Sequence, residues 1–230
     1  MPLRAARAVI FDLDGTLVDS LPDIAWHLNA ALADAGLATY SIGEIRSWVG
    51  SGAAQLVARA VVGPERIEDV LSRFRAHYRA NPYARTSVFE GLAEALDHIG
   101  NERPLAILSN KPHDLVVTIA EALLAPWPFR QILGEQPGTP RKPDPQALLA
   151  IAKAFDLPPE ACVLVGDSEI DVATARAAGM PSVAVTWGLC DPPRARGCDP
   201  HRRHAGGACG FVRSAGVAIG WAHGMSQVPQ

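Results

Sequence analysis

Short apolar stretches alternate with segments of helical spacing along much of this chain, and the alternation restricts the folds available to it. Strand character is found in AVIF, LAIL, QILG, CVLVG and SVAVT, at 8–11, 105–108, 131–134, 162–166 and 182–186. Helical spacing is found at 89–100, 113–124, 145–156 and 169–179. Such alternation is typical of a parallel sheet covered by helices on both faces. We therefore predict an α/β fold whose core is a Rossmann-like, doubly wound parallel sheet.

Residues 20–85 interrupt this alternation. Several stretches of helical spacing follow one another there with no apolar strand between them. Because the block comes directly after the first strand, we predict a helical cap domain inserted into an α/β catalytic core. The core then comprises 1–19 and 86–188, and 189–230 form an atypical C-terminal tail. A separate cap over a crevice is one way to exclude water from a reaction.

The charge balance argues against some functions. Among 230 residues, 24 acidic side chains face 21 basic ones, which gives a net charge of −3. We therefore expect no general role in binding nucleic acid or an anionic membrane surface. The longest apolar runs are far too short to span a bilayer, and residues 1–7 do not begin a secretory signal. From these observations we expect a cytoplasmic protein.

Polar side chains follow several of the strand patterns, and a lysine precedes one of the helices: Asp12, Asp14, Ser109, Asn110, Asp167 and Lys142. Each of them alone has an ordinary structural explanation, such as a turn, a helix cap or a solvated charge. Parallel strands place their carboxyl ends at one edge of a sheet, where ligands bind near a switch in strand order. The set as a whole therefore indicates a ligand site.

The chemistry of this set favours phosphoryl transfer. Carboxylates with a lysine can hold Mg²⁺, which prefers oxygen ligands and often binds a substrate phosphate as well. The metal and the lysine would offset the repulsion between the phosphate and the carboxylates. One aspartate can attack phosphorus, and a second, two residues on, can protonate the leaving oxygen and later deprotonate a water molecule.

The motifs in this order resemble those of haloacid dehalogenase-superfamily phosphatases. D-x-D-G-T lies at 12–16, S-N at 109–110 and K-P-x-P at 142–145, and G-D-S with a further aspartate lies at 166–171. The chain is most similar to phosphoglycolate phosphatase-like members with a small helical cap. The resemblance covers about residues 7–188, and four motifs in this order are highly specific.

The resemblance implies roles for the acidic residues. Asp12 would be the nucleophile and a Mg²⁺ ligand. Asp14 would be the general acid and base, with its backbone carbonyl on the metal, and its presence argues against dehalogenation. Asp167 would be a metal ligand, and Asp171 would lie beside the metal ligands or be one of them.

The resemblance also implies residues that bind the substrate. The phosphate would be bound around Thr16, which supports the loop, and by Ser109, Asn110 and Lys142. The segment WVGSG at 48–52 resembles the substrate-specificity loop of the cap, with the small residues Gly50, Ser51 and Gly52. A plain turn between two helices explains this segment equally well. The chain departs from the family pattern at Glu90–Gly91, where Pro-Gly is common, so the hinge is in doubt.

The function implied is a Mg²⁺-dependent phosphatase that hydrolyses a small phosphorylated metabolite, such as 2-phosphoglycolate, through an aspartyl-phosphate. A phosphosugar mutase of the same superfamily is one alternative. A catalytically impaired binding protein with a defective C-terminus is another, although the intact acidic and lysine residues count against it. The substrate itself is not encoded in motifs that many chemistries share.

The C-terminal tail departs from the rest of the sequence. From Leu189 onward the strand and helix periodicity is lost, while Cys, His, Arg and Gly accumulate. The resemblance leads us to expect a short strand and then a helix here. We hypothesise a change of reading frame, with a native disordered tail as the alternative. Resequencing the gene across Leu189 would decide between them.

Overall fold

The computed structural model describes residues 6–189 and 209–212, which contain a main sheet of parallel strands in the order β5-β4-β1-β6-β7-β8. These strands are β1 (Ala8–Phe11), β4 (Leu105–Pro112), β5 (Phe129–Glu135), β6 (Cys162–Gly166), β7 (Ser182–Val185) and β8 (Cys209–Val212). The chain begins in the middle of the sheet, builds β4 and β5 on one side, and then returns to build β6 and β7 on the other. The order therefore reverses around β1, and a crevice opens beyond its carboxyl end.

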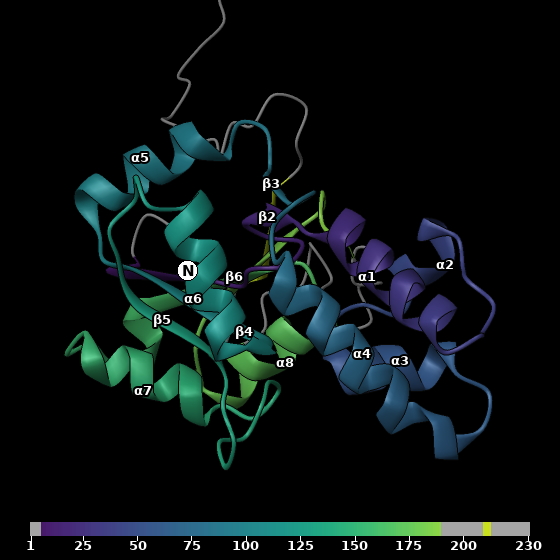
Figure 1. Cartoon of the computed structure of the whole chain (residues 1–230). Helices are drawn as coiled ribbons and strands as arrows, with labels where there is room; N and C mark the ends of the chain where they lie inside the picture. Colours follow the sequence, from purple (N-terminus) through teal and green to yellow (C-terminus); the bar gives the residue numbers. More distant parts are fainter. Residues whose placement is uncertain (1–5, 190–208, 213–230) are drawn as a thin grey trace, which may run out of the picture.

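Helices cover both faces of this sheet (Figure 1). One face packs against α5 (Leu92–Glu102) and α6 (His113–Leu123), and the other against α7 (Gln146–Ala154) and α8 (Glu169–Ala177). The central strand shows the reason: Val9 and Phe11 belong to the first apolar core, whereas Ala8 and Ile10 belong to the second. Successive strand side chains point to opposite faces, so a fully apolar strand must be buried on both. The predicted α/β fold is confirmed.

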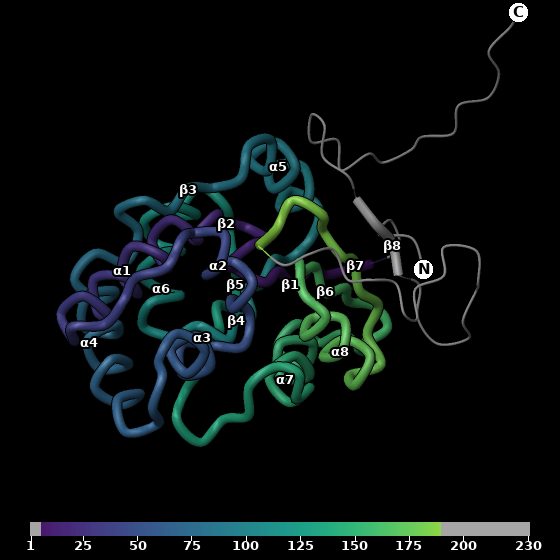
Figure 2. Tube along the Cα trace, turned by 90° about the vertical axis from the view of Figure 1, so that its right-hand side faces the viewer, coloured from purple at the N-terminus to yellow at the C-terminus, as the bar shows by residue number. Residues whose placement is uncertain are grey.

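A cluster of helices, here called the helical insert (residues 20–85), lies beside the sheet (Figures 1 and 2). It contains α1 (Leu21–Asp34), α2 (Ile42–Arg46), α3 (Ala53–Ala60) and α4 (Ile67–Ala80). Its apolar faces form a core of their own, which Leu115 and Leu189 join from outside the insert. The two segments that connect it to the sheet pair as antiparallel strands, β2 (Val18–Asp19) and β3 (Ser87–Val88).

Three features differ from the sequence-based expectations. The short pair β2–β3 was not expected, because two-residue strands leave no periodic pattern. Strand β4 continues through Ser109–Pro112, so the polar residues after LAIL still belong to the strand. In the tail, Cys209–Val212 pair in parallel with β7, although the sequence shows no strand periodicity there. The rest of the tail, and with it the frame-change hypothesis, lies outside the described residues.

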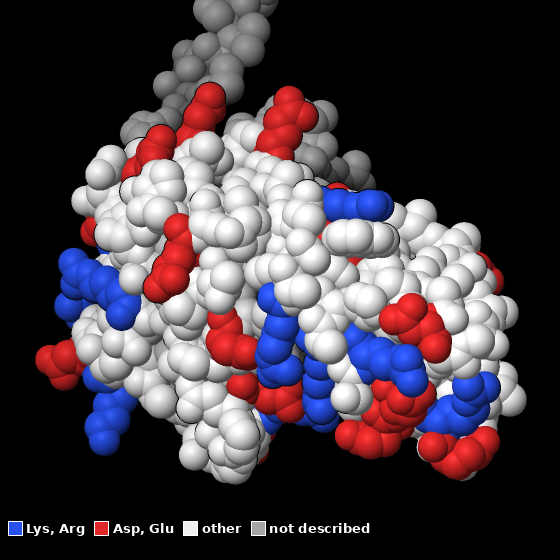
Figure 3. Space-filling model, viewed as in Figure 1, with Lys and Arg blue, Asp and Glu red and all other residues white. Residues whose placement is uncertain are grey.

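The surface carries charges of both signs. On the face seen in Figure 3 acidic and basic side chains are interspersed, and neither kind forms a large continuous patch there. Within the described residues, the structure contains no helix of the length and apolar character needed to cross a membrane.

Candidate active site

A pocket lies where the carboxyl edge of the sheet faces the helical insert. Most of the residues that the sequence predicted for the site line it from the sheet side: Asp12, Asp14, Ser109, Asn110, Lys142 and Asp167. Gly50 and Gly52 line it from the insert. Thr16, Ser51 and Asp171 do not border the pocket. The structure therefore brings together side chains that lie up to about 150 residues apart in the chain.

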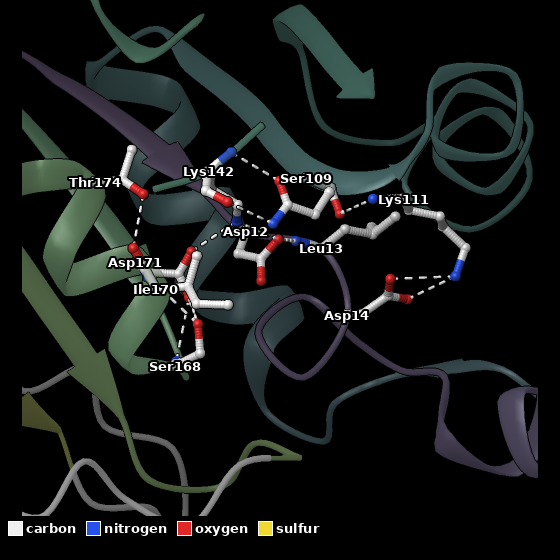
Figure 4. Close-up of polar contacts among 11 residues, drawn as sticks. Asp12, Leu13, Asp14, Ser109, Lys111, Lys142, Ser168, Ile170, Asp171 and Thr174 are labelled. Atoms are coloured by element: carbon white, nitrogen blue, oxygen red, sulfur yellow. Dashed lines mark hydrogen bonds and ion pairs between the residues drawn. The ribbon is translucent and has the colours of Figure 1, made fainter. Parts of the chain in front are cut away.

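Asp12 directly follows β1 and faces Lys142 (Figure 4). Its N–H donates to the carbonyl of Val165 at 2.8 Å. Its Oδ1 accepts from the N–H of Leu13 at 2.7 Å and lies 2.9 Å from Nζ of Lys142. Within the described part of the chain no group donates to Oδ2. Burial, together with the carboxylates of Asp171 and Asp167, raises the pKa of Asp12 to about 8 against the opposing effect of Lys142. Asp12 is thus held by one oxygen and faces the pocket.

Lys142 is buried between two carboxylates. Its Nζ donates to Oδ1 of Asp171 at 2.6 Å and lies 2.9 Å from Asp12. Burial opposes the charge, but the two carboxylates raise the pKa of Lys142 above its usual range. The other oxygen of Asp171 accepts from the N–H and hydroxyl of Ser168, which caps α8 in a reciprocal capping box. Asp171 therefore fixes Lys142 to the start of a helix.

Ser109 and Asn110, which follow the apolar part of β4, make different contacts. The amide of Asn110 accepts from the Lys142 N–H at 2.9 Å and donates to its carbonyl at 3.1 Å, so both ends of the amide position Lys142. Ser109 is buried at the pocket, where its Oγ accepts from the Lys111 N–H at 3.2 Å. Thr16 is buried as well, and its Oγ1 has no hydrogen-bond partner among the described residues. Phosphate contacts from the side chains of Thr16 and Asn110 stay predictions.

Sequence reasoning missed a second lysine at the site. Nζ of Lys111 donates to both oxygens of Asp14, at 2.9 and 3.2 Å, and to the phenolic oxygen of Tyr78 at 3.0 Å. Tyr78 lies on α4, so this contact joins the sheet edge to the helical insert. Burial lowers the pKa of Lys111, but Asp14 and Tyr78 outweigh this and raise it above its usual range. Its place directly after Ser109-Asn110 at a strand end was the signal available in the sequence.

A group of carboxylates could hold a metal ion. One oxygen from each of Asp12, Asp167 and Asp171 lies within 4.8 Å of the others. Three carboxylates against the single ammonium of Lys142 leave two negative charges, which one divalent cation would balance. All the donors are oxygens, as Mg²⁺ prefers. Because Asp171 already has partners on both oxygens, Asp12 and Asp167 are the better candidate ligands.

Asp167 fits beside two glycines, because they have no side chain to occupy its place. A Cβ at Gly188 would overlap the side chain of Asp167, and one at Gly15 would overlap its carboxylate. Oδ2 of Asp167 accepts from the Leu189 N–H at 2.7 Å, which ties the carboxylate to the loop after β7. Any side chain at either glycine would push Asp167 away from Asp12.

The predicted specificity loop contacts the core. Gly50 and Gly52 have φ values of +114° and +86°, which residues with a side chain rarely adopt. A Cβ at Gly52 would lie 2.9 Å from Nη1 of Arg141 on the core. Nearby, Arg46 of α2 donates to the carbonyls of Gly188 and Leu189 at 2.7 and 3.0 Å. The loop therefore closes one side of the pocket, although Ser51 itself does not line it.

The sequence is similar to that of known proteins. The sequence model of the family described as haloacid dehalogenase-like hydrolase matches residues 9–185. The chain belongs to this family. Phosphoglycolate phosphatase 1 of Pseudomonas aeruginosa is 38% identical over 194 residues, which cover 80% of this chain and 71% of that protein. Phosphoglycolate phosphatase of Rhodospirillum rubrum is 38% identical over 198 residues, covering 81% and 82% respectively.

Solved structures of the family share the fold. A crystal structure from Haemophilus somnus, described as a predicted phosphoglycolate phosphatase, has a TM-score of 0.74 at 29% identity and covers 81% of this chain and 88% of that one. A haloacid dehalogenase-like hydrolase from Streptococcus pneumoniae has a TM-score of 0.76 at 25% identity, with coverage of 82% and 89%. The family predicted from the sequence motifs is therefore confirmed, while the roles of single residues stay predictions.

Proposed function

We propose that this protein is a Mg²⁺-dependent phosphatase that hydrolyses a small phosphomonoester, similar to 2-phosphoglycolate, through a phosphorylated Asp12. The observation that carries the proposal is the position of Asp12. Its carboxylate is held through one oxygen next to Lys142, and it borders the pocket at the point where the strand order reverses. The names of the relatives support the same class of substrate.

The first half of the proposed reaction transfers the phosphoryl group to the enzyme. Oδ2 of Asp12 forms a bond to phosphorus while the bond from phosphorus to the ester oxygen breaks. Asp14 protonates the departing alcohol oxygen, and Lys111 fixes the direction of its carboxylate. Lys142 and the hydroxyl of Ser109 bind the phosphoryl oxygens. Mg²⁺, held by Asp12, Asp167 and the Asp14 carbonyl, would supply positive charge to offset that of the phosphate.

The second half returns the enzyme to its starting state. Asp14 now accepts a proton from a water molecule, whose oxygen attacks the phosphorus of the phosphorylated Asp12. The bond between phosphorus and Oδ2 breaks, inorganic phosphate leaves, and Asp12 is again a carboxylate. We propose that the helical insert serves as the cap, which excludes bulk water while the alcohol is still bound. Its contacts with the sheet edge through Tyr78 and Arg46 support that role.

Release of inorganic phosphate from a panel of phosphorylated metabolites, with and without Mg²⁺, tests the proposal. We expect Mg²⁺-dependent release from at least one small ester. A mutase would instead move the phosphoryl group within a sugar phosphate and release almost none. Absence of turnover with every ester at saturating Mg²⁺ would overturn the proposal and favour a binding protein.

The variant Asp12→Asn tests the nucleophile. An amide cannot form the phosphorylated intermediate, so we expect turnover to be abolished while the fold is retained. Circular dichroism and thermal unfolding provide the control for the fold. If the variant keeps a tenth of the wild-type activity, Asp12 is not the nucleophile.

A further inference from the structure

The wall that the helical insert contributes to the pocket is apolar except at one charged residue. The insert places Ile24, Val49, Leu56, Phe74 and other uncharged residues there, and Arg75 of α4 stands among them. Arg75 is exposed to solvent, and among the described residues it is the one charged side chain that the insert contributes to the pocket. In the proposed reaction the metal and the phosphate are bound by residues at the sheet edge. The alcohol part of the substrate would therefore meet the wall formed by the insert.

Arg75 differs from the other cations around it. On the same helix Arg73 pairs with Asp69 and Arg79 pairs with Asp114, each at 2.9 Å. The two pocket lysines are bound by carboxylates as described above. Within the described residues Arg75 has neither a hydrogen bond nor an ion pair. It is thus the pocket cation whose charge no protein carboxylate takes up.

The helix places Arg75 close to the reacting groups. It precedes Tyr78 by three residues, so the two residues lie on neighbouring positions of one side of α4, about 4.5 Å apart along the axis. Both residues line the pocket, and Tyr78 contacts Lys111, which holds Asp14. A group that Arg75 binds would therefore lie only a few bonds from the phosphate.

We propose that Arg75 binds a carboxylate on the alcohol part of the substrate, so that the pocket selects phosphomonoesters that carry a second anionic group. The inference rests on the proposed phosphatase function and names its substrate class. A guanidinium presents parallel N–H donors that match the two oxygens of a carboxylate, and it stays charged at any physiological pH.

Paired substrates and variants test the proposal. The substrates are 2-phosphoglycolate and 2-hydroxyethyl phosphate, which replaces the carboxylate with an uncharged CH₂OH group. We expect Arg75→Gln to lower kcat/KM for 2-phosphoglycolate by about tenfold or more, which corresponds to about 1.4 kcal/mol. The loss with 2-hydroxyethyl phosphate should be several times smaller. Arg75→Lys should recover only part of the activity, because it keeps the charge without the paired donors.

The control is Arg73→Gln on the same helix, since Arg73 does not border the pocket and pairs only with Asp69 among the described side chains. It should change kcat/KM little for both substrates. An equal loss for both substrates in Arg75→Gln, or no loss for either, would overturn the proposal.

A binding measurement separates this inference from the proposed function. Calorimetry with 2-phosphoglycolate on Asp12→Asn, with and without Arg75→Gln, requires no turnover. We expect the second substitution to raise Kd by about tenfold, and an unchanged Kd would overturn the role of Arg75. Absence of phosphate release by the wild-type protein would instead overturn the phosphatase proposal alone.

Discussion

The contact between Lys111 and Tyr78 joins the sheet edge to the helical insert, and its removal should have a measurable effect on stability. Nζ of Lys111 lies 3.0 Å from the phenolic oxygen and 4.4 Å from the centre of the same ring. Burial raises the pKa of Tyr78 to about 12, so near pH 8 the partner of the ammonium is a neutral phenol. The variant Tyr78→Phe removes this oxygen and keeps the ring.

The expected loss in the free energy of unfolding depends on which contacts of Lys111 each variant keeps. A hydrogen bond to a charged group contributes about 1.5–3 kcal/mol. Lys111 keeps both contacts to Asp14 and the ring contact in Tyr78→Phe, so the loss should lie near the lower end, about 1.5 kcal/mol. Lys111→Met removes the partner of Asp14 as well, and breaking such a buried pair costs about 3 kcal/mol. The double variant should lose about 3 kcal/mol rather than the sum of the two single losses. Once Lys111 is replaced, removal of the Tyr78 oxygen breaks no further contact with it.

Urea unfolding at pH 8, followed by circular dichroism, measures the four free energies of this cycle. We expect a coupling energy of about 1.5 kcal/mol, with unchanged dependence on urea concentration. Tyr83→Phe is the matched control, because Tyr83 is exposed and has no hydrogen bond of its own within the described residues; its effect should stay within about 0.5 kcal/mol. A coupling energy below about 0.5 kcal/mol would refute the reasoning, because the two losses would then be independent.

Further predictions concern the metal, the specificity loop and the glycines around Asp167. Asp167→Ala should weaken Mg²⁺ binding, so that the activity recovers in part at high Mg²⁺ when phosphate release is titrated with the metal. Gly50→Val should lower kcat/KM for the natural substrate about tenfold, or about 1.4 kcal/mol, and affect a small generic phosphate ester much less, because φ is +114° there. Gly188→Ala should lower the free energy of unfolding by at least about 2 kcal/mol and reduce activity, since the new Cβ would overlap Asp167.

Each of these predictions has a contrary outcome. An unchanged Mg²⁺ dependence would count against Asp167 as a ligand. Equal losses for both substrates in Gly50→Val would make the loop structural only. For Gly188→Ala the control is Gly43→Ala in α2, where a Cβ would have ample room; equal effects of the two would show that the space beside Asp167 is not needed.

The sequence by itself determined the parallel sheet and the edge at which the site lies. Cys162–Gly166 and Ala8–Phe11 were predicted at the bounds that the structure has, and the other three predicted strands overlap β4, β5 and β7. Such strands are specified locally, because a short apolar run must be buried on both faces of a sheet. The residue after each run then lies at the carboxyl edge, which is why Asp12 and Asp167 could be predicted as neighbours.

Only the tertiary structure decided which partner each polar side chain takes. The Asn110 amide hydrogen-bonds the backbone of Lys142, 32 residues away, and its predicted role in binding phosphate stays a prediction. Lys111 contacts Tyr78 across the boundary with the insert, and Arg75 on the pocket wall has no partner among the residues that the structure describes. Periodicity and spacing in the sequence determine the position of a residue on its own strand or helix. Its partner is set by how two separately formed elements pack, and that packing depends on contacts between residues far apart in the chain.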